Sequence, residues 1–326
     1  MGIQLRSDDG VAEVVIDFPP VNALPVTGWF ELADAVTAAG ADPATRAVIL
    51  AAEGRGFCAG VDIKQIQRTP GHEALVGANR GCFAAFAAVY ECPVPVIAAV
   101  HGFCLGGGVG LAGNADIVVA ASDATFGLPE VDRGALGAAT HLSRLVPQHL
   151  MRAMVYTCRT VAAQQLLAFG SVLEVVPPPD LRAAARAVAG EIAAKDPAVI
   201  RLAKQSLNGI DPVDVKRSYR YEQGFTFELN LTGVSDEARQ AFLDGPAVGD
   251  DGQVGQARPE DRPDQGHRLA PGPPPADPDR HAGAQLAGDV VGAQRLSGHG
   301  RSRNAWRASS ETPVRLSSNV NPCSYR

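Results

Sequence analysis

Two short glycine-rich segments carry backbone amides that can face a ligand. The first runs from Gly56 to Lys64 as GFCAGVDIK, and the second from His101 to Gly108 as HGFCLGGG. Small residues let a backbone approach a ligand closely, and the free N–H groups at a helix start attract negative charge. Two such N–H groups converging on one carbonyl oxygen form an oxyanion hole, which stabilises a developing enolate. Each segment taken alone is also compatible with an ordinary structural turn.

One carboxylate is a candidate acid or base. Glu130 follows the apolar segment ATFGLP, and Pro129 fixes the backbone just before it. A carboxylate in apolar surroundings holds its proton more tightly, which suits it to proton transfer near neutral pH. The alternative is a surface glutamate with no chemical role.

A nucleotide site is a competing interpretation of the second glycine segment. Residues 108–113 read GVGLAG and match the dinucleotide-binding pattern GxGxxG. A dinucleotide fold needs a full helix between these glycines and the next strand, whereas Asn114-Ala115-Asp116 leads directly into Ile117. A P-loop is excluded as well, because no Gly-Lys-Ser or Gly-Lys-Thr follows. We therefore predict no nucleotide site of either kind.

The elements that must position these segments alternate between strand and helix. Val11 to Phe18 alternates as a strand, and the helix pattern over 27–39 places Trp29 and Leu32 on one face. Short apolar strands separated by helices are typical of an α/β sheet covered on its faces. We expect strands over 11–18, 47–51, 94–100 and 117–121, and helices over 27–39, 79–90, 148–157, 161–169, 180–194, 197–208 and 212–243. The aromatic residues of the last segment (Tyr219, Tyr221, Phe225 and Phe227) can pack on their own domain or against another subunit.

Composition divides the chain near Gly245. Residues 246–326 are dominated by Pro, Gly, Arg, Asp and His, with no repeating apolar face. Such a segment cannot bury enough surface to offset its ordering entropy, so we predict disorder there. It can be a linker, a binding tail or an out-of-frame extension of a GC-rich gene.

Charge and cysteine content narrow the partners and the compartment. The formal net charge of -6 argues against nucleic acid, which usually requires a basic face. No apolar run approaches the roughly 20 residues that span a bilayer, and the N-terminus lacks a secretory pattern. The six cysteines form no CxxC pair and no zinc-ligand cluster. We expect a cytoplasmic protein with reduced thiols and no membrane partner.

Taken in order, these motifs resemble the crotonase (enoyl-CoA hydratase/isomerase) superfamily over residues 10–245. The resemblance also includes Pro19-Pro20-Val21-Asn22-Ala23-Leu24 near the start. It implies a core of repeated ββα units over about 1–195 and a helical region over about 196–245 that forms homotrimers, often paired into homohexamers. It further implies an acyl-CoA substrate, with CoA entering as part of that substrate and no metal or separate cofactor.

The resemblance assigns roles to residues of both glycine segments. It implies that the N–H groups of Val61 and Gly107 form the oxyanion hole, with Gly106 in the adjoining turn. Backbone groups of Val61 and its neighbours would hold the adenine end of CoA, and Asp62 would order their loop rather than react. The neighbours in question are Ala59, Ile63 and, close by, Lys64.

The catalytic carboxylates depart from the family pattern. Glu130 matches the second of the two glutamates that hydratases of the family use, but the first position is Gly110. One carboxylate argues against ordinary hydration, although Asp132 is a candidate second acid. Gly110 would leave room for a bulky substrate. His141 can contact the substrate or serve as a loop or helix-cap histidine.

Longer stretches resemble the ring-opening acyl-CoA hydrolases of actinobacterial steroid catabolism, which act on a bicyclic β-keto acyl-CoA. These stretches include RGFCAGVDIK, LPEVDRGALGAATHLSRLVPQHLMRAM and YEQGFTFELNL. The resemblance implies that Glu130 activates water for attack on a ring ketone, and that the resulting thioester enolate rests on the oxyanion hole. The alternatives are an enoyl-CoA isomerase or hydratase for simpler chains, and a non-catalytic acyl-CoA binder.

Overall fold

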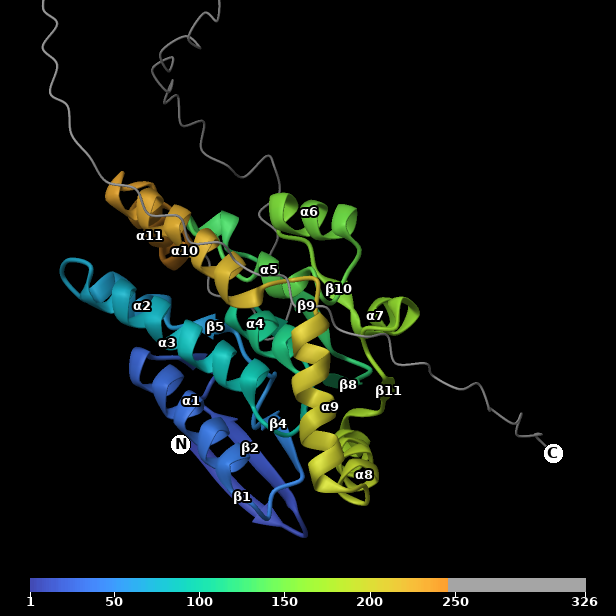
Figure 1. The fold of residues 1–326 in the computed structure, drawn as a ribbon. Helices are drawn as coiled ribbons and strands as arrows, with labels where there is room; N and C mark the ends of the chain where they lie inside the picture. The colour runs from blue at the N-terminus through green and yellow to red at the C-terminus, as the bar shows by residue number, and fades with distance from the viewer. Residues whose placement is uncertain (246–326) are drawn as a thin grey trace, which may run out of the picture. The chain divides into compact units, whose positions relative to one another are not determined.

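A computed structural model describes residues 1–245 as a mixed α/β fold, the predicted class (Figure 1). The segment 246–326, for which the sequence predicts disorder, lies outside the described residues. The strands are β1 (Gly2–Asp8), β2 (Val11–Asp17), β3 (Ala23–Leu24), β4 (Ala47–Ala52), β5 (Gly60–Val61), β6 (Val96–Val100), β7 (Phe103–Leu105), β8 (Ile117–Ala121), β9 (Thr125–Gly127), β10 (Val161–Ala162) and β11 (Glu174–Val176). The helices are α1 (Val26–Ala41), α2 (Ile63–Arg68), α3 (Glu73–Glu91), α4 (Gly107–Asn114), α5 (Ala139–Leu142), α6 (Gln148–Thr157), α7 (Ala163–Phe169), α8 (Leu181–Ala193), α9 (Pro197–Ile210), α10 (Val215–Leu231) and α11 (Val234–Asp244), with short 3-10 turns η1 (Val131–Arg133) and η2 (Pro178–Asp180).

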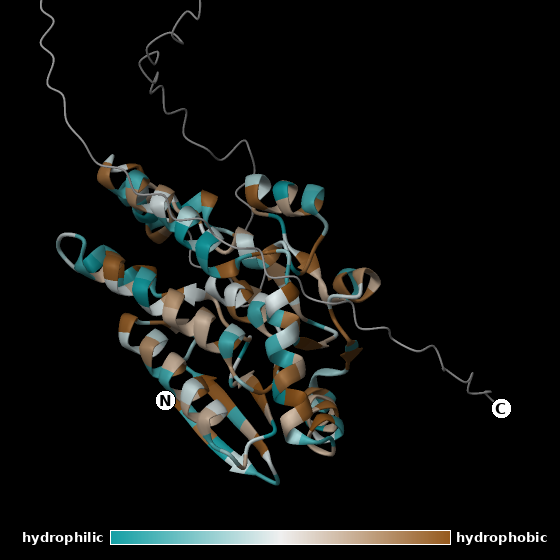
Figure 2. Cartoon of the chain, viewed as in Figure 1, coloured by the Kyte–Doolittle hydropathy of each residue, from teal (hydrophilic) through white to brown (hydrophobic). Residues whose placement is uncertain are grey.

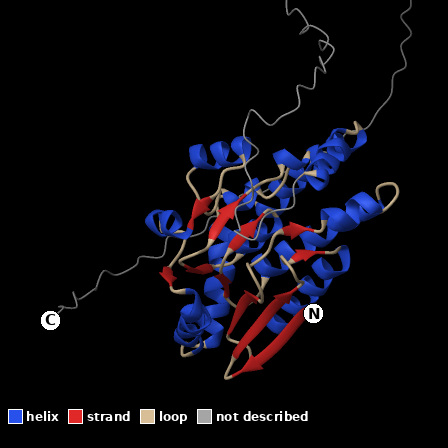
Figure 3. Ribbon diagram, turned by 180° about the vertical axis from the view of Figure 1, so that it is seen from behind, coloured by secondary structure: helices blue, strands red, loops and turns tan. Residues whose placement is uncertain are grey.

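A six-stranded sheet underlies the fold, in the order β1-β2-β4-β6-β8-β11. Figure 3 shows the strands in red among the blue helices. β1 and β2 form an antiparallel hairpin, and the other neighbours pair in parallel. Every residue of β4 and β6 is buried. Uninterrupted apolar strands are expected where helices cover both faces of a parallel sheet.

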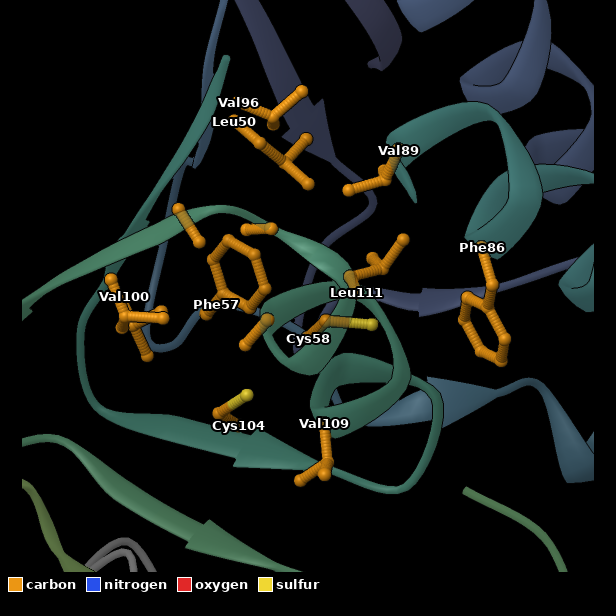
Figure 4. Packing of buried hydrophobic residues seen from close by; sticks show 14 of the residues in the cluster. Leu50, Phe57, Cys58, Phe86, Val89, Val96, Val100, Cys104, Val109 and Leu111 are labelled. Atoms are coloured by element: carbon orange, nitrogen blue, oxygen red, sulfur yellow. The ribbon is translucent and has the colours of Figure 1, made fainter. Parts of the chain in front are cut away.

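Alternating residues of β4 pack into two separate hydrophobic cores, one on each face of the sheet. Val48 and Leu50 belong to the larger core, whereas Ala47 and Ile49 pack with residues of α8 on the other face. Figure 4 shows Leu50 in the larger core together with Phe57 and Leu111. Each large apolar side chain buried in this way stabilises the fold by roughly 1.5–3 kcal/mol. The larger core therefore anchors both glycine-rich segments, since Phe57 belongs to the first and Leu111 follows the second.

A second, smaller sheet sets the ends of two loops side by side. β7 pairs in parallel with β9, with Leu105 opposite Gly127. Parallel strands leave a sheet at the same edge. The turn at Gly106 and the segment leading to Glu130 therefore start next to each other. The amide of Gly106 donates a hydrogen bond to the carbonyl of Gly127 at 3.0 Å, an ordinary length for such a bond.

The C-terminal helical region differs from the prediction in one respect. The sequence predicted a single helix over 212–243, but the structure has α10 and α11, separated at Gly233. Gly233 has φ +82°, a left-handed conformation that ends a helix and that glycine adopts without penalty. Elements that were not predicted include β1 and β11, the two edge strands of the six-stranded sheet, and α3 begins at Glu73 rather than at residue 79. No helix within residues 1–245 combines the length and the apolar character needed to cross a membrane.

Candidate active site

The two glycine-rich segments run alongside each other. Cys58 and Cys104 form a parallel bridge, the Leu105 amide donates to the Cys58 carbonyl at 2.8 Å, and the Phe57 amide donates to the Phe103 carbonyl at 3.0 Å. Both cysteine side chains are buried in the larger core. These bonds fix the distance between the two loops, so the structure brings together the segments that the sequence could only place separately.

The loops touch at Gly60 and Gly107. A Cβ added to Gly60 would lie 3.0 Å from the Gly107 nitrogen, and Gly60 has φ +94°. Gly107 is the first residue of α4, so its N–H has no partner within the helix. Val61, the other proposed donor, follows Gly60 on β5 and lines the same cavity. The two amide positions are therefore neighbours, at a helix start that attracts negative charge.

Glu130 lies against the same turn. Its Oε1 is 2.5 Å from where a Cβ on Gly106 would be, so any side chain at 106 would collide with the carboxylate. The other oxygen, Oε2, is shielded from solvent and has no hydrogen-bond partner within residues 1–245. Glu130 therefore lines the cavity while one of its carboxylate oxygens has no partner in the described protein.

Burial changes the protonation of Glu130. Removal of its carboxylate from water raises its pKa from 4.5 to about 8. A backbone hydrogen bond and the nearby Arg133 partly oppose this shift, and the charge of Glu222 adds to it. Glu130 is therefore neutral in the free protein at pH 7, and it is a strong base once it is ionised.

The cavity around Glu130 has a volume of about 490 Å³. Asp62 and Glu130 are the acidic residues that line it within the described part of the chain. A mostly apolar pocket with a few polar groups is the usual form of a small-molecule site. The apolar side chains come from distant parts of the sequence and include Phe18, Val21, Ile66, Leu75, Phe86, Phe103, Leu136 and Phe242.

The loop after Gly60 forms one side of the cavity. Asp62 caps α2, accepting hydrogen bonds from the amides of Lys64 at 2.9 Å and Gln65 at 3.3 Å. This geometry agrees with a loop-ordering role for Asp62, since capping uses its carboxylate. Ala59 and Ile63 are half-buried in the cavity wall, and Lys64 is exposed to solvent beside it.

Gly110 needs a correction. The sequence predicted that its small size leaves room for substrate, but Gly110 does not line the cavity. A Cβ there would lie 2.6 Å from Cε1 of Phe86, whose ring packs beside α4 (Figure 4). Phe86 itself lines the cavity. The missing glutamate is thus replaced by a phenylalanine ring from α3, so the departure from the hydratase pattern makes this wall apolar.

His141 lies outside the cavity lining, which favours the second of its two interpretations, a histidine with a structural place in its segment. Its ring packs at 4.9 Å, centroid to centroid, on both Phe86 and Tyr219, which do line the cavity. Nδ1 is 2.9 Å from the side-chain nitrogen of Asn114, which can only donate, so Nδ1 accepts and Nε2 carries the proton. Burial, reinforced by Arg144, lowers the pKa of His141 to about 3. His141 is therefore a neutral packing residue.

Several cavity residues were not singled out from the sequence. Cys82 and Asn79 come from α3, Arg133 from η1, and Tyr219 from α10. The sequence left open whether the aromatics of the last segment pack on their own domain or against another subunit. Tyr219 is buried against its own domain, whereas Tyr221 is 72% exposed. Only Arg133 had a local signal, as a charged residue three positions after Glu130.

Comparison with known proteins places this geometry in context. The sequence profile of the enoyl-CoA hydratase/isomerase family matches residues 6–243. The chain is 67% identical over 245 residues to a "(7aS)-7a-methyl-1,5-dioxo-2,3,5,6,7,7a-hexahydro-1H-indene-carboxyl-CoA hydrolase" of Rhodococcus jostii, an alignment covering 75% of this chain and 95% of the relative. It is 68% identical over 236 residues to a hydrolase of the same name from Mycobacterium tuberculosis, covering 72% of this chain and 96% of the relative.

A solved structure supports the same fold. The crystal structure of an enoyl-CoA hydratase/isomerase from Xanthobacter autotrophicus superposes with a TM-score of 0.67 at 28% identity. The match covers 76% of this chain and 99% of that chain. The predicted crotonase fold is thereby confirmed for the matched part of the sequence.

Proposed function

Because the chain belongs to the enoyl-CoA hydratase/isomerase family, we propose that it hydrolyses a ring carbon–carbon bond of a bicyclic β-keto acyl-CoA in steroid catabolism. The observation that carries this proposal is the 67–68% identity, over 95–96% of their length, to two hydrolases of a methylated dioxo-indene-carboxyl-CoA. The site geometry fits the same chemistry. It offers one unpaired carboxylate next to two backbone amides, in a cavity of about 490 Å³.

Glu130 is the general base of the proposed reaction. Its ionised carboxylate takes a proton from water, and the water oxygen adds to the ring ketone. Collapse of this adduct breaks the adjacent ring bond and leaves a carboxylic acid where the ketone was. The electron pair of the broken bond passes into the thioester as an enolate, which then takes a proton at carbon. The reaction consumes one water with no net oxidation or reduction, so it needs no redox cofactor.

The amides of Val61 and Gly107 hold the thioester oxygen in this proposal. They interact more strongly with the enolate than with the neutral thioester, because charge develops on that oxygen as the ring bond breaks. The CoA portion lies along residues 59–64, with Lys64 at the solvent side. Proximity of Gly107 to the start of α4 supports the assignment, since the helix dipole favours the same negative charge.

An enoyl-CoA hydratase for simple chains is the second candidate function, but the cavity lacks the second acidic residue that this reaction needs. Two-carboxylate hydration needs a second acid opposite Glu130, and Phe86 occupies the space beside Gly110. Asp132 is exposed and does not line the cavity. A single carboxylate suits attack by one water or a proton shuttle, and the relatives' identity favours the former.

Turnover by the purified chain tests the proposal. The bicyclic thioester, crotonyl-CoA and a 3-enoyl-CoA are incubated separately and followed by mass spectrometry. We expect the bicyclic thioester to gain one water while the other two remain unchanged. Hydration of crotonyl-CoA or migration of the 3-enoyl double bond, with the bicyclic thioester left intact, would assign the chain to the hydratase/isomerase activities instead.

The pH dependence of the rate follows from the raised pKa of Glu130. Only the ionised carboxylate accepts a proton from water, so kcat/KM should rise about tenfold per pH unit below the pKa of about 8 and level off above it. Steady-state rates measured between about pH 6 and about pH 9.5 check this expectation. A plateau that already begins near pH 5 would mean that Glu130 is ionised in the free protein.

We also propose that the chain assembles as a homotrimer or homohexamer through its C-terminal helices. α9 exposes Leu202, Leu207 and Ile210 at 64%, 61% and 74%. Leu207 and Ile210 are three positions apart and are therefore neighbours on the helix surface. Figure 2 marks hydrophobic residues along this helix. Large exposed apolar residues on one face are typical of interaction surfaces.

We further propose a cytoplasmic location. The free state of the five cysteines within residues 1–245 fits a reducing compartment such as the cytoplasm.

The assembly proposal predicts the effect of a charge on α9. Leu202→Asp should lower the sedimentation coefficient from that of a trimer or hexamer to that of a monomer, because an unpaired carboxylate in an apolar interface is costly. Glu191→Asp on α8 serves as the control, as it keeps both charge and character. Analytical ultracentrifugation of both variants provides the measurement. An unchanged coefficient for Leu202→Asp would remove α9 from the interface.

A further inference from the structure

Arg133 is a cation in the cavity wall without an ionic partner. It lines the cavity next to Glu130 and is half-buried. Within residues 1–245 it forms no ion pair, and its Nη1 donates a hydrogen bond to the Pro129 carbonyl at 2.8 Å. Its guanidinium carbon lies 4.1 Å above the ring of Phe242, which holds the side chain flat. Nε and Nη2 have no partner in the described part of the chain, although arginine offers five N–H donors.

A second arginine of the cavity, Arg239, is already bound by other protein groups. Arg239 is 5% exposed and pairs with Asp236. It also donates from Nη1 to Asn230 at 3.0 Å and from Nε to Gln67 at 3.2 Å. Its donors are therefore satisfied by the protein. Arg133 differs because its charge is buried beside the candidate base and available to a ligand.

The proposed reaction creates a charge at this end of the cavity. Water adds to a neutral ring ketone, and the product there is a carboxylate. A carboxylate formed in a mostly apolar cavity needs a counter-charge, since an unpaired buried charge is costly. A guanidinium fork matches the two oxygens of a carboxylate, and it matches the two oxygens of the preceding adduct equally well.

We propose that Arg133 binds the carboxylate that ring opening creates, an inference that rests on the proposed function. The same N–H groups contact the ketone oxygen as a neutral acceptor before the reaction and as an oxyanion after water adds. The interaction strengthens as charge develops, so Arg133 accelerates ring opening as well as holding the product. The protons balance, because the water proton passes to Glu130, the proton of the new carboxylic acid passes to the enolate carbon, and Arg133 stays protonated throughout.

A binding experiment tests Arg133 without requiring turnover. Affinities of glutaryl-CoA and adipyl-CoA are compared with that of hexanoyl-CoA by calorimetry, for wild type, Arg133→Met and Arg133→Lys. We expect a wild-type preference for at least one carboxylate-bearing thioester of about tenfold or more, lost in Arg133→Met and partly restored by Lys. Arg55→Met is the matched control, since Arg55 also lines the cavity but is exposed to solvent. It should shift all three affinities alike.

Turnover provides the second readout. On the bicyclic thioester, Arg133→Met should lower kcat by about 10²-fold with KM changed by less than about threefold, because the lost contact is strongest in the charged states. A wild type with no carboxylate preference, or an Arg133→Met variant that weakens hexanoyl-CoA as much as the others, would reduce Arg133 to a structural residue. If the wild type leaves the bicyclic thioester intact, the proposed function fails, and the carboxylate preference alone decides the role of Arg133.

Discussion

Replacing Glu130 with Gln is expected to lower kcat for the bicyclic thioester by about 10³-fold. Gln has nearly the same shape as Glu but cannot accept a proton from water, so only orientation and the backbone amides remain to assist the reaction. The side chain should keep its place against Gly106. Single-turnover and steady-state rates followed by mass spectrometry provide the measurement.

One control separates this effect from damage to the fold. Glu222→Gln changes a half-buried carboxylate, which accepts hydrogen bonds from the Ala139 and Thr140 amides and does not line the cavity. It should leave kcat within a few-fold of wild type. If the chain were a non-catalytic acyl-CoA binder, wild type and Glu130→Gln would bind thioesters equally well and neither protein would turn them over. That result would contradict a catalytic role for Glu130.

Glu130→Gln is also expected to change the pH dependence of stability. The folded pKa of Glu130, about 8, is raised above the unfolded value of 4.5, so between these values the folded protein holds a proton that the unfolded chain has lost. Wild-type stability from this group is complete below about pH 4.5 and falls as pH rises to about 8. Glu130→Gln removes that loss. Its Tm should therefore exceed the wild-type Tm by more at pH 8 than at pH 5.

Gly106→Ala is expected to be the most damaging substitution of a residue that does no chemistry itself. Gly106 has φ +54°, and its new Cβ would lie 2.5 Å from Oε1 of Glu130. Either the carboxylate or the turn must move, and the Gly107 amide moves with the turn. We expect kcat to fall by at least about 10²-fold, as when one oxyanion-hole donor is displaced.

The matched control for Gly106→Ala is Gly170→Ala. Gly170 has φ +77°, ends α7, and has no atom within 4 Å of an added Cβ. Alanine there carries the left-handed backbone penalty of about 1–2 kcal/mol without a collision. Gly170→Ala should therefore lower Tm while leaving kcat unchanged. Equal losses of activity in both variants would mean that backbone strain, and not the position of Glu130, limits the rate.

Local features of this site could be predicted from the sequence because they depend on neighbouring residues. The strand before Gly56 and the glycine turn at Gly106 each lie within a few residues of the pattern that predicts them. The family resemblance supplied the pairing of the two loops, which the bridge between Cys58 and Cys104 and the backbone hydrogen bonds beside it now explain. The break at Gly233 was missed because a single glycine inside a helical pattern does not by itself end a helix.

Contacts across the fold could not be predicted in this way. Phe86 lies 24 positions before Gly110 in the sequence, and nothing local to either residue indicates that the ring fills the space beside α4. For the same reason His141 could not be placed behind Phe86 and Tyr219 from its own segment. Arg133 was quoted in a motif but not recognised, because its lack of an ion pair is visible only once its surroundings are known.

The most direct test follows the oxygen atom of water into the product. The chain and the bicyclic thioester are mixed in water enriched in heavy oxygen, and the product is fragmented in a mass spectrometer while free thiol is measured in parallel. We predict one heavy oxygen in the new carboxylate, an intact CoA thioester and no release of CoA. Heavy oxygen in a carboxylate formed at the thioester carbon, together with free CoA, would show that the chain cleaves the thioester and not the ring.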